Sequence, residues 1–211
     1  MTARKLLLLT LGLASIAGAA AAADKMIDPN RVFPYLAAYW KLPPAERTRF
    51  APAYLFKHQG QPLAVRVAIV QGASSNPIPL RPDGRVGRLP TLVELENGKL
   101  HIGLDEKDKF TSSMQVEALV RPAAQMDVRE LAAAIDQASA GEKKLAGLMG
   151  FMAPKLTELG FEGVPSGEVR FADGHKAPLP LDGALPVFAP AKFPGAVTVV
   201  LPNPPSRVTI G

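Results

Sequence analysis

The chain has no cysteine among its 211 residues. Disulfides, cysteine-ligated metals and thiol chemistry are therefore excluded. A lipid anchor attached through a cysteine at the cleaved N-terminus is excluded for the same reason. Packing and hydrogen bonding must stabilise the fold without covalent cross-links.

The sequence also lacks the common catalytic motifs. It has no Gly-x-Ser-x-Gly elbow, Ser-x-x-Lys pair, His-Glu-x-x-His motif, phosphate-binding loop or Gly-x-Gly-x-x-Gly turn. These motifs are the usual signs of hydrolase, zinc, nucleotide and dinucleotide sites, so we expect no cofactor and no metal. An active site built from residues far apart in the chain remains compatible with the sequence, because catalytic triads are defined by geometry and not by chain order.

Residues 1–23 have the three-part pattern of a cleavable signal peptide. A positive start at Arg4 and Lys5 precedes an apolar run, and Ala21 and Ala23 occupy the two positions that signal peptidase reads before the cut. We therefore predict cleavage after Ala23, a mature N-terminus at Asp24 and a periplasmic location. The alternative is an uncleaved membrane anchor, which needs roughly 20 apolar residues, and the alanine-rich end makes cleavage the better interpretation.

The charge of the mature chain is only mildly basic. The full sequence has 24 Lys and Arg against 19 Asp and Glu, and loss of Arg4 and Lys5 leaves a net charge of +3. Because no dense basic run accompanies this excess, we do not expect a nucleic-acid partner. A weak preference for anionic surfaces of the cell envelope is compatible with the charge.

The first mature segment, residues 24–56, is rich in aromatic side chains. It holds seven of the thirteen aromatic residues of the chain. Tyr35, Tyr39 and Trp40 fall in a short helix predicted to begin at Pro34, and the two tyrosines would share a face. Such rings can bind sugars or a partner protein, so the three are candidate ligand-binding residues. The same rings could instead form a strap that packs across a sheet, and we expect Trp40 to be a packing anchor.

Three further segments follow and suggest the fold class. Residues 57–121 have β patterns, residues 122–160 have helical patterns, and residues 161–211 are proline-rich with β patterns. We therefore predict a β-rich α+β fold of mostly antiparallel, sandwich-like sheets, with a helical unit between two strand-rich segments. This architecture is similar to immunoglobulin-like and carboxypeptidase-regulatory-like modules, a likeness of fold that implies no function.

Local signals within residues 57–121 predict particular strands and turns. Residues 63–70 alternate as a strand does, and Arg81–Arg85 has the proline and glycine of a tight turn. The clearest prediction is a hairpin in which Leu92–Glu96 and Lys99–Gly103 flank an Asn97–Gly98 turn.

The later segments contain helical signals followed by a return to strands. A helix is predicted to begin at Asp127 and to end at Gly141, and a second helical pattern over 145–159 should break near Ala153. A hairpin is predicted around Asp173–Gly174, followed by strands over Val197–Leu201 and Arg207–Ile210. Asp-Gly turns with similar flanks occur near Asp83 and near Asp173, a likeness too weak to establish a repeat.

Four sets of polar residues could form a site, although each is also explained as a solvated face or turn. They are three histidines for zinc (His58, His101, His175), two carboxylates for acid–base chemistry (Glu94, Glu96), three arginines for an anion (Arg81, Arg85, Arg88) and the Asp105–Asp108 loop for calcium.

The sequence thus predicts an exported binding or accessory protein of the cell envelope, with envelope proteins or glycan as partners. One alternative is a hydrolase of wall glycan or peptide that draws on His101, Glu94, Glu96 and Asp105. Another is a structural assembly subunit that pairs a sheet edge with strands of its partners.

Overall fold

The computed structural model describes residues 25–105, 107–146 and 155–211. It confirms the predicted β-rich α+β class, because antiparallel strands dominate and helices are few. The predicted signal peptide lies outside the described residues. Within the described ranges, no helix is both long and apolar enough to cross a membrane.

The helices are short except for one. They are α1 (Pro29–Val32), α2 (Leu36–Lys41), η1 (Pro44–Glu46), α3 (Leu92–Asn97), α4 (Val128–Ala146) and η3 (Pro190–Lys192). The strands are β1 (Lys25–Ile27), β2 (Phe50–His58), β3 (Gln61–Pro62), β4 (Val67–Gln71), β5 (Ser74–Pro77), β6 (Lys99–Ile102), β7 (Phe110–Ala118), β8 (Gln125–Asp127), β9 (Leu159–Glu162), β10 (Glu168–Phe171), β11 (Lys176–Pro178), β12 (Leu181–Asp182), β13 (Leu185–Phe188), β14 (Ala196–Val200) and β15 (Arg207–Ile210).

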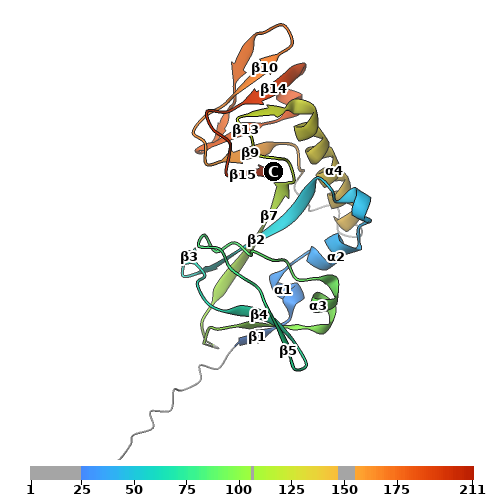
Figure 1. Ribbon diagram of the computed structural model, residues 1–211, viewed down its shortest axis with the longest axis vertical. Helices are drawn as coiled ribbons and strands as arrows, with labels where there is room; N and C mark the ends of the chain where they lie inside the picture. The colour runs from blue at the N-terminus through green and yellow to red at the C-terminus, as the bar shows by residue number, and fades with distance from the viewer. Residues whose placement is uncertain (1–24, 106, 147–154) are drawn as a thin grey trace, which may run out of the picture.

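These strands form three antiparallel sheets. The N-terminal sheet has the order β1-β6-β4-β5, and the C-terminal sheet has the order β11-β10-β14-β8. A seven-stranded sheet, in the order β12-β13-β9-β15-β7-β2-β3, contains strands from both halves of the chain. Figure 1 shows the N-terminal sheet at the bottom and the C-terminal sheet at the top, with the seven-stranded sheet between them.

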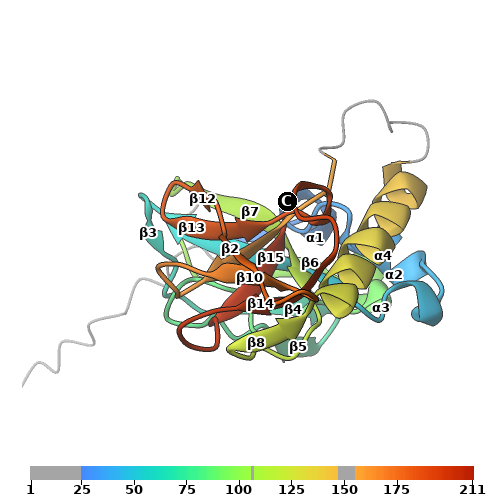
Figure 2. The same ribbon diagram turned by 90° about the horizontal axis from the view of Figure 1, so that it is seen from above.

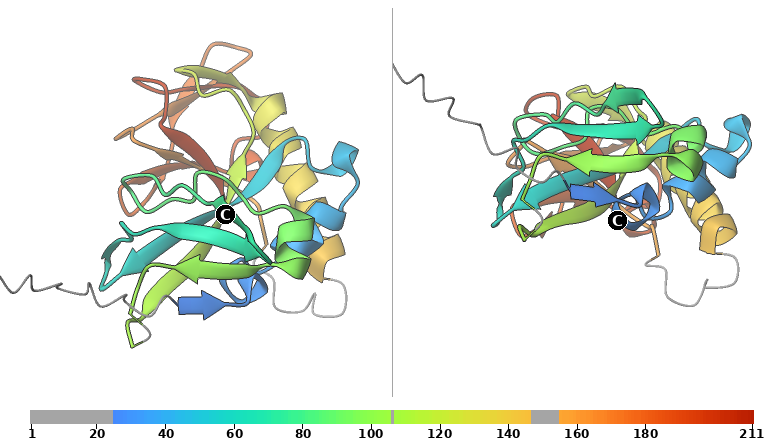
Figure 3. Two further views of the ribbon diagram at one scale, coloured as in Figure 1. Left: turned by 60° about the horizontal axis from the view of Figure 1, so that its bottom comes forward. Right: turned by 90° about the horizontal axis from the view of Figure 1, so that it is seen from below.

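The two four-stranded sheets have the same topology. In the N-terminal sheet, β1 pairs with β6, and β6 pairs with β4 of the β4–β5 hairpin. In the C-terminal sheet, β8 pairs with β14, and β14 pairs with β10 of the β10–β11 hairpin. The order β1-β6-β4-β5 therefore corresponds to β8-β14-β10-β11. The central pairs also correspond, because Ile69 pairs with Leu100 and Val169 pairs with Val199, and all four side chains are fully buried. Figure 3 shows β1, β6 and β4 side by side, as blue, green and teal strands.

The equivalence extends beyond these sheets. Asp28 after β1 accepts a hydrogen bond from the backbone N–H of Asn30, as Asp127 at the end of β8 does from that of Arg129. Strands β2 and β7 pair as β9 and β15 do. The described chain therefore consists of two topologically equivalent halves, and their strands are joined where β7 pairs with β15. The Asp-Gly turns near Asp83 and Asp173 are not equivalent in this arrangement, because Asp173 lies between β10 and β11 whereas Asp83 lies after β5.

Long helix α4 lies beside the C-terminal sheet. Leu131, Ala134 and Ala138 on one helical face are fully buried, and the helix contacts β8 and β14 (Figure 2). The prediction that Gly141 ends this helix is wrong, because α4 continues to Ala146. Gly141 instead lets the ring of Phe50 approach the helix, since an added Cβ would come within 2.6 Å of that ring.

The predicted second helical pattern over 145–159 is wrong for its last residues. Leu159 is the first residue of β9, and Leu156 is buried outside any helix. The expected break near Ala153 lies outside the described residues. Strand β4 is also shorter than the predicted run, since it begins at Val67 and not at residue 63.

The predicted hairpin around Asn97–Gly98 is wrong in its first arm. Leu92–Asn97 is helix α3, and only Lys99–Ile102 is a strand. Gly98 has a φ of −101° and not the positive angle that the hairpin turn requires. The helix forms because Thr91 and Glu94 make a capping box, in which each side chain accepts a hydrogen bond from the backbone of the other residue.

Two other predicted turns are confirmed. Gly84 donates its N–H to Arg81 O at 2.9 Å and has a φ of +81°. The hairpin of β10 and β11 turns at Gly174, whose φ is +88°. The last two predicted strands are also present as β14 and β15.

Candidate binding groove

The three predicted aromatic site residues lie in different environments. Tyr35 is 58% exposed and has a φ of +65° before α2, whereas Tyr39 is buried and donates its hydroxyl to Phe50 O at 3.0 Å. Trp40 is partly buried, and its Nε1 donates to Pro90 O at 2.7 Å. The tyrosines therefore do not share one face, and the binding role of the three residues stays a prediction.

The histidines are distributed among separate parts of the fold. His58 ends β2 in the seven-stranded sheet, and His101 lies in β6 of the N-terminal sheet. His175 lies in the β10–β11 hairpin, stacked on Phe171 with its Nδ1 2.6 Å from Asp173 Oδ1. Within residues 25–105, 107–146 and 155–211, no group of three or more histidine or acidic side chains could hold a metal ion.

The two carboxylates proposed for acid–base chemistry are each paired with a basic side chain. Glu94 is buried at the start of α3, where Arg88 donates to both of its oxygens at 2.8 and 3.2 Å. Burial raises the pKa of Glu94, but the hydrogen bonds from Arg88 and from the backbone of Thr91 outweigh it and hold the pKa below its ordinary value. Glu96 is exposed and pairs with Lys41 of α2 at 3.1 Å.

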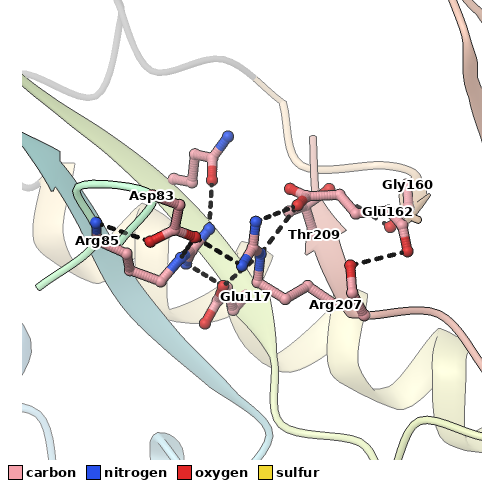
Figure 4. A network of polar contacts seen from close by, with 9 residues as sticks. Asp83, Arg85, Glu117, Gly160, Glu162, Arg207 and Thr209 are labelled. Atoms are coloured by element: carbon pink, nitrogen blue, oxygen red, sulfur yellow. Dashed lines mark hydrogen bonds and ion pairs between the residues drawn. The ribbon is translucent and has the colours of Figure 1, made fainter. Parts of the chain in front are cut away.

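Arg85, from the predicted arginine turn, belongs to a polar network where the two halves meet (Figure 4). Its buried guanidinium pairs with Glu117 of β7 through Nη1 and donates from Nη2 to Gln115 Oε1 at 3.1 Å. Its Nε faces Asp83 Oδ2 at 3.9 Å, which is an electrostatic contact and not a hydrogen bond.

Arg207 of β15 extends this network into the second half. Its Nη1 donates to Asp83 Oδ2 at 3.1 Å and its Nε to Glu162 Oε2 of β9 at 2.9 Å. The backbone N–H of Arg85, aided by Arg207, outweighs desolvation and holds the pKa of Asp83 below its ordinary value. All five charged groups are thus paired with one another, and we interpret the network as a structural tie across the β7–β15 joint.

An open polar surface lies on the C-terminal sheet. Val169 of β10 and Val199 of β14 point into the core, so the alternate residues Glu168, Arg170 and Val200 lie on the opposite, outer face. Lys176 of β11 is directly opposite Arg170 and shares this face. Figure 2 views the molecule from above, with β10, β14 and β8 of this sheet toward the reader.

A shallow groove of about 390 Å³ opens at one end of this outer face. Its volume is in the range of small-ligand and peptide sites. Its lining combines charged and apolar side chains from β10, β11 and β14 and the segments beside them: Ser166, Gly167, Glu168, Lys176, Ala177, Pro178, Val200, Leu201 and Pro202.

Three charged side chains form a ladder at the groove, named here the charged triad. Arg170 Nε and Lys176 Nζ both lie 3.1 Å from the same oxygen, Oε1, of Glu168. The hydrogen bond from Lys176 and then that from Arg170 hold the pKa of Glu168 below its ordinary value. The side chains are 33–51% exposed, so their pairing contributes little to stability.

The N-terminal sheet provides an internal comparison for the charged triad. Register places Ala68, Val70 and Ser75 at the positions equivalent to Glu168, Arg170 and Lys176. The same strand pairing therefore forms in this chain without any of the three charges. The fold does not require the charged triad, which favours a role for it in binding.

Both free hairpin edges are protected against strand addition. Alternate residues of β11 bond to β10, as shown by Leu179 N–H to Gly167 O, so Lys176 and Pro178 present their backbone groups to the open edge. Proline has no N–H to offer there, and Pro77 occupies the equivalent place in β5. These prolines disfavour the alternative in which a long partner strand pairs with either edge.

Comparisons of the chain with protein-family models, curated proteins and solved structures find no match. The groove is therefore interpreted from its own geometry. Sequence reasoning missed it, although alternating charge at Glu168 and Arg170 was a visible sign of a wet strand face. The meeting of β10, β11 and β14, which are far apart in the chain, had no sequence signal.

Proposed function

We propose that the protein is a binding or accessory protein of the cell envelope, exported by residues 1–23 and active in the periplasm. The groove on the outer face of the C-terminal sheet is its contact surface. The observation that carries this proposal is the charged triad, of which Glu168 and Lys176 line an open groove while Arg170 pairs with Glu168 beside it. The triad is absent from the equivalent sheet of the same chain.

The surroundings of the acidic candidates favour binding over hydrolysis. Glu94 supports α3 through Arg88 and Thr91, and Glu96 pairs with Lys41 on the surface. In a glycoside hydrolase, two carboxyl groups flank the substrate, and one of them must hold a proton near neutral pH. The lowered pKa of Glu94 is opposite to that requirement.

The groove lining favours a protein partner over a glycan. Sugar rings commonly stack on aromatic side chains, and the groove is lined by prolines, aliphatic residues and charges. A protein segment fits this mixture, because apolar contacts can supply affinity while charges select the partner.

Site-specific photo-crosslinking in envelope extract tests the contact surface. A crosslinking amino acid at Ser166, an exposed residue in the groove lining, should give discrete protein adducts. The same amino acid at Asp136, an exposed position on α4, is the matched control and should give none. Absence of adducts from Ser166, or equal adducts from both positions, would contradict the proposed surface.

Export is tested on the same preparation. N-terminal sequencing of protein released from the periplasm should begin at or next to Asp24, because the small alanines before it suit signal peptidase. Recovery of the chain in the membrane fraction with Met1 or Thr2 intact would contradict export by a cleaved signal.

A further inference from the structure

The charged triad is not electrically balanced. The single carboxylate of Glu168 faces both the guanidinium of Arg170 and the ammonium of Lys176, so the group carries one surplus positive charge. Asp127, in the same cross-strand row beyond Thr198, does not offset it, because Arg129 already pairs with Asp127 at 2.7 Å. The outer face at the groove, where Arg170 lies beside the lining residues Glu168 and Lys176, therefore complements an anion.

The donor geometry at the groove suits a carboxylate in particular. Arg170 and Lys176 each pair with Oε1 of Glu168 through one nitrogen, and an ammonium has three donors while a guanidinium has five. Donors of Arg170 and Lys176 consequently remain for a second acceptor on the same face. A planar carboxylate can bind such a pair of cations as Glu168 does.

The lining of the groove and the edge beside it indicate which kind of molecule carries this carboxylate. Pro178 and Pro202 line the groove together with the apolar side chain of Val200. At the neighbouring edge, Lys176 presents one backbone N–H and C=O, while Pro178 blocks further pairing. A short extended segment can use that one backbone position and place apolar side chains against the prolines.

We propose that the groove binds an extended peptide segment whose carboxylate is held by Arg170 and Lys176, beside small apolar residues that contact Pro178, Val200 and Pro202. This inference rests on the proposed function and specifies its ligand. Glu168 orients the two cations in the free protein and competes with the incoming carboxylate.

Fluorescence anisotropy with labelled decapeptide mixtures tests the ligand class on the purified protein. One mixture has three fixed glutamates among alanine, valine, serine and threonine, and the matched mixtures have glutamine or lysine in their place. We expect the glutamate mixture to bind at least about tenfold more tightly than the others, with the difference shrinking at high salt. Free and amidated C-termini distinguish a side-chain carboxylate from a chain terminus.

Variants separate the proposed role from general effects of charge. Lys176→Glu should weaken binding of the glutamate mixture at least about fivefold, because it replaces attraction by repulsion. Ser75→Glu, at the equivalent position of the N-terminal sheet, is the matched control and should leave binding unchanged. Glu168→Gln should tighten binding by removing the competing carboxylate, a gain that a purely structural role for Glu168 would not produce.

The outcomes distinguish this inference from the proposed function. Equal binding of the glutamate and glutamine mixtures, or equal loss from Lys176→Glu and Ser75→Glu, would overturn the peptide-carboxylate ligand. Binding of alginate, an acidic polysaccharide, without binding of any peptide mixture would overturn it in favour of a glycan. If crosslinks from Ser166 persisted in either case, the groove would remain the contact surface, and if they were absent the proposed function itself would fail.

Discussion

Single residues in the aromatic lead segment show which properties the sequence could predict. The packing role predicted for Trp40 agrees with its partly buried ring, over which Arg47 lies at 4.9 Å from the ring centre. Its hydrogen bond to Pro90 O, 50 residues away in the chain, had no local signal. The tendency of a large ring to be buried is a property of the residue, whereas its partner is a property of the whole fold.

Gly98 is required by close packing and not by its backbone angles. Its φ of −101° suits any residue, but an added Cβ would collide with Ile69 and come within 2.5 Å of Glu94 O. We expect Gly98→Ala to destabilise the protein by about 1–3 kcal/mol, as overpacking does, measured by urea unfolding. Gly103→Ala is the control, because its Cβ would meet nothing closer than 3.6 Å, and it should not destabilise. Equal stability of Gly98→Ala and the parent protein would contradict the crowding.

At the scale of elements, α3 shows how two local signals can compete. Val93 and Leu95 alternate with Glu94 and Glu96 as in a strand, and Asn97–Gly98 resembles a hairpin turn. The helix forms because Thr91 and Glu94 make a capping box and Arg88 donates to both carboxylate oxygens of Glu94. The capping-box spacing was present in the sequence, so this error came from weighting the turn signal above the cap.

The capping box also predicts a pH-dependent stability. The folded-state pKa of Glu94 lies below its ordinary value of 4.5, so its contribution is complete above that value and is lost as the pH falls through the folded pKa. Glu94→Gln should therefore cost about 1–2 kcal/mol near pH 7, and the difference from the parent protein should narrow below about pH 4. Glu96→Gln, in an exposed pair with Lys41, is the control and should show little difference at any pH. A gap for Glu94→Gln that is constant with pH would contradict this role.

Other elements followed from local chemistry and could be predicted. The turn at Gly84 and the hairpin at Gly174 require positive φ angles that glycine adopts without strain. The start of α4 after Asp127 followed from a capping residue before a helical apolar pattern. The end of α4 did not, because tertiary packing of Phe50 against Gly141 carries the helix past a residue that commonly stops one.

At the scale of the whole molecule, the joint between the halves was not predictable from one sequence. Asp83, Glu117, Glu162 and Arg207 come from distant parts of the chain, and the pairing of β7 with β15 brings them together. The equivalence of the halves was also hidden, because it is preserved in strand order and burial more than in residue identity.

This joint should respond strongly to loss of its most buried charge. The side chain of Arg85 is 3% exposed, so Arg85→Leu would remove the hydrogen-bonded partner of Glu117 and Gln115 and leave Arg207 Nε, at 3.9 Å, as the remaining cation near Glu117. We expect a loss of about 2–4 kcal/mol in unfolding free energy, because a partly buried carboxylate loses its hydrogen-bonded cation. Lys144→Met removes an exposed pair with Glu46 and should change stability by less than about 0.5 kcal/mol. Trp40 fluorescence and circular dichroism should report one common transition, and equal stability of the two variants would show that the network does not tie the halves.

The position of β15 has a consequence for the order of folding after the proposed export. β15 is the last described strand in the chain, yet it lies inside the seven-stranded sheet between β9 and β7. A chain that crosses a membrane N-terminus first presents β2 and β7 long before β15 arrives, and pairings between distant segments form slowly. We expect the large sheet to close only after β15 has emerged. Until then β7 has an unpaired edge open to self-association, which the finished protein covers with its own C-terminal strand.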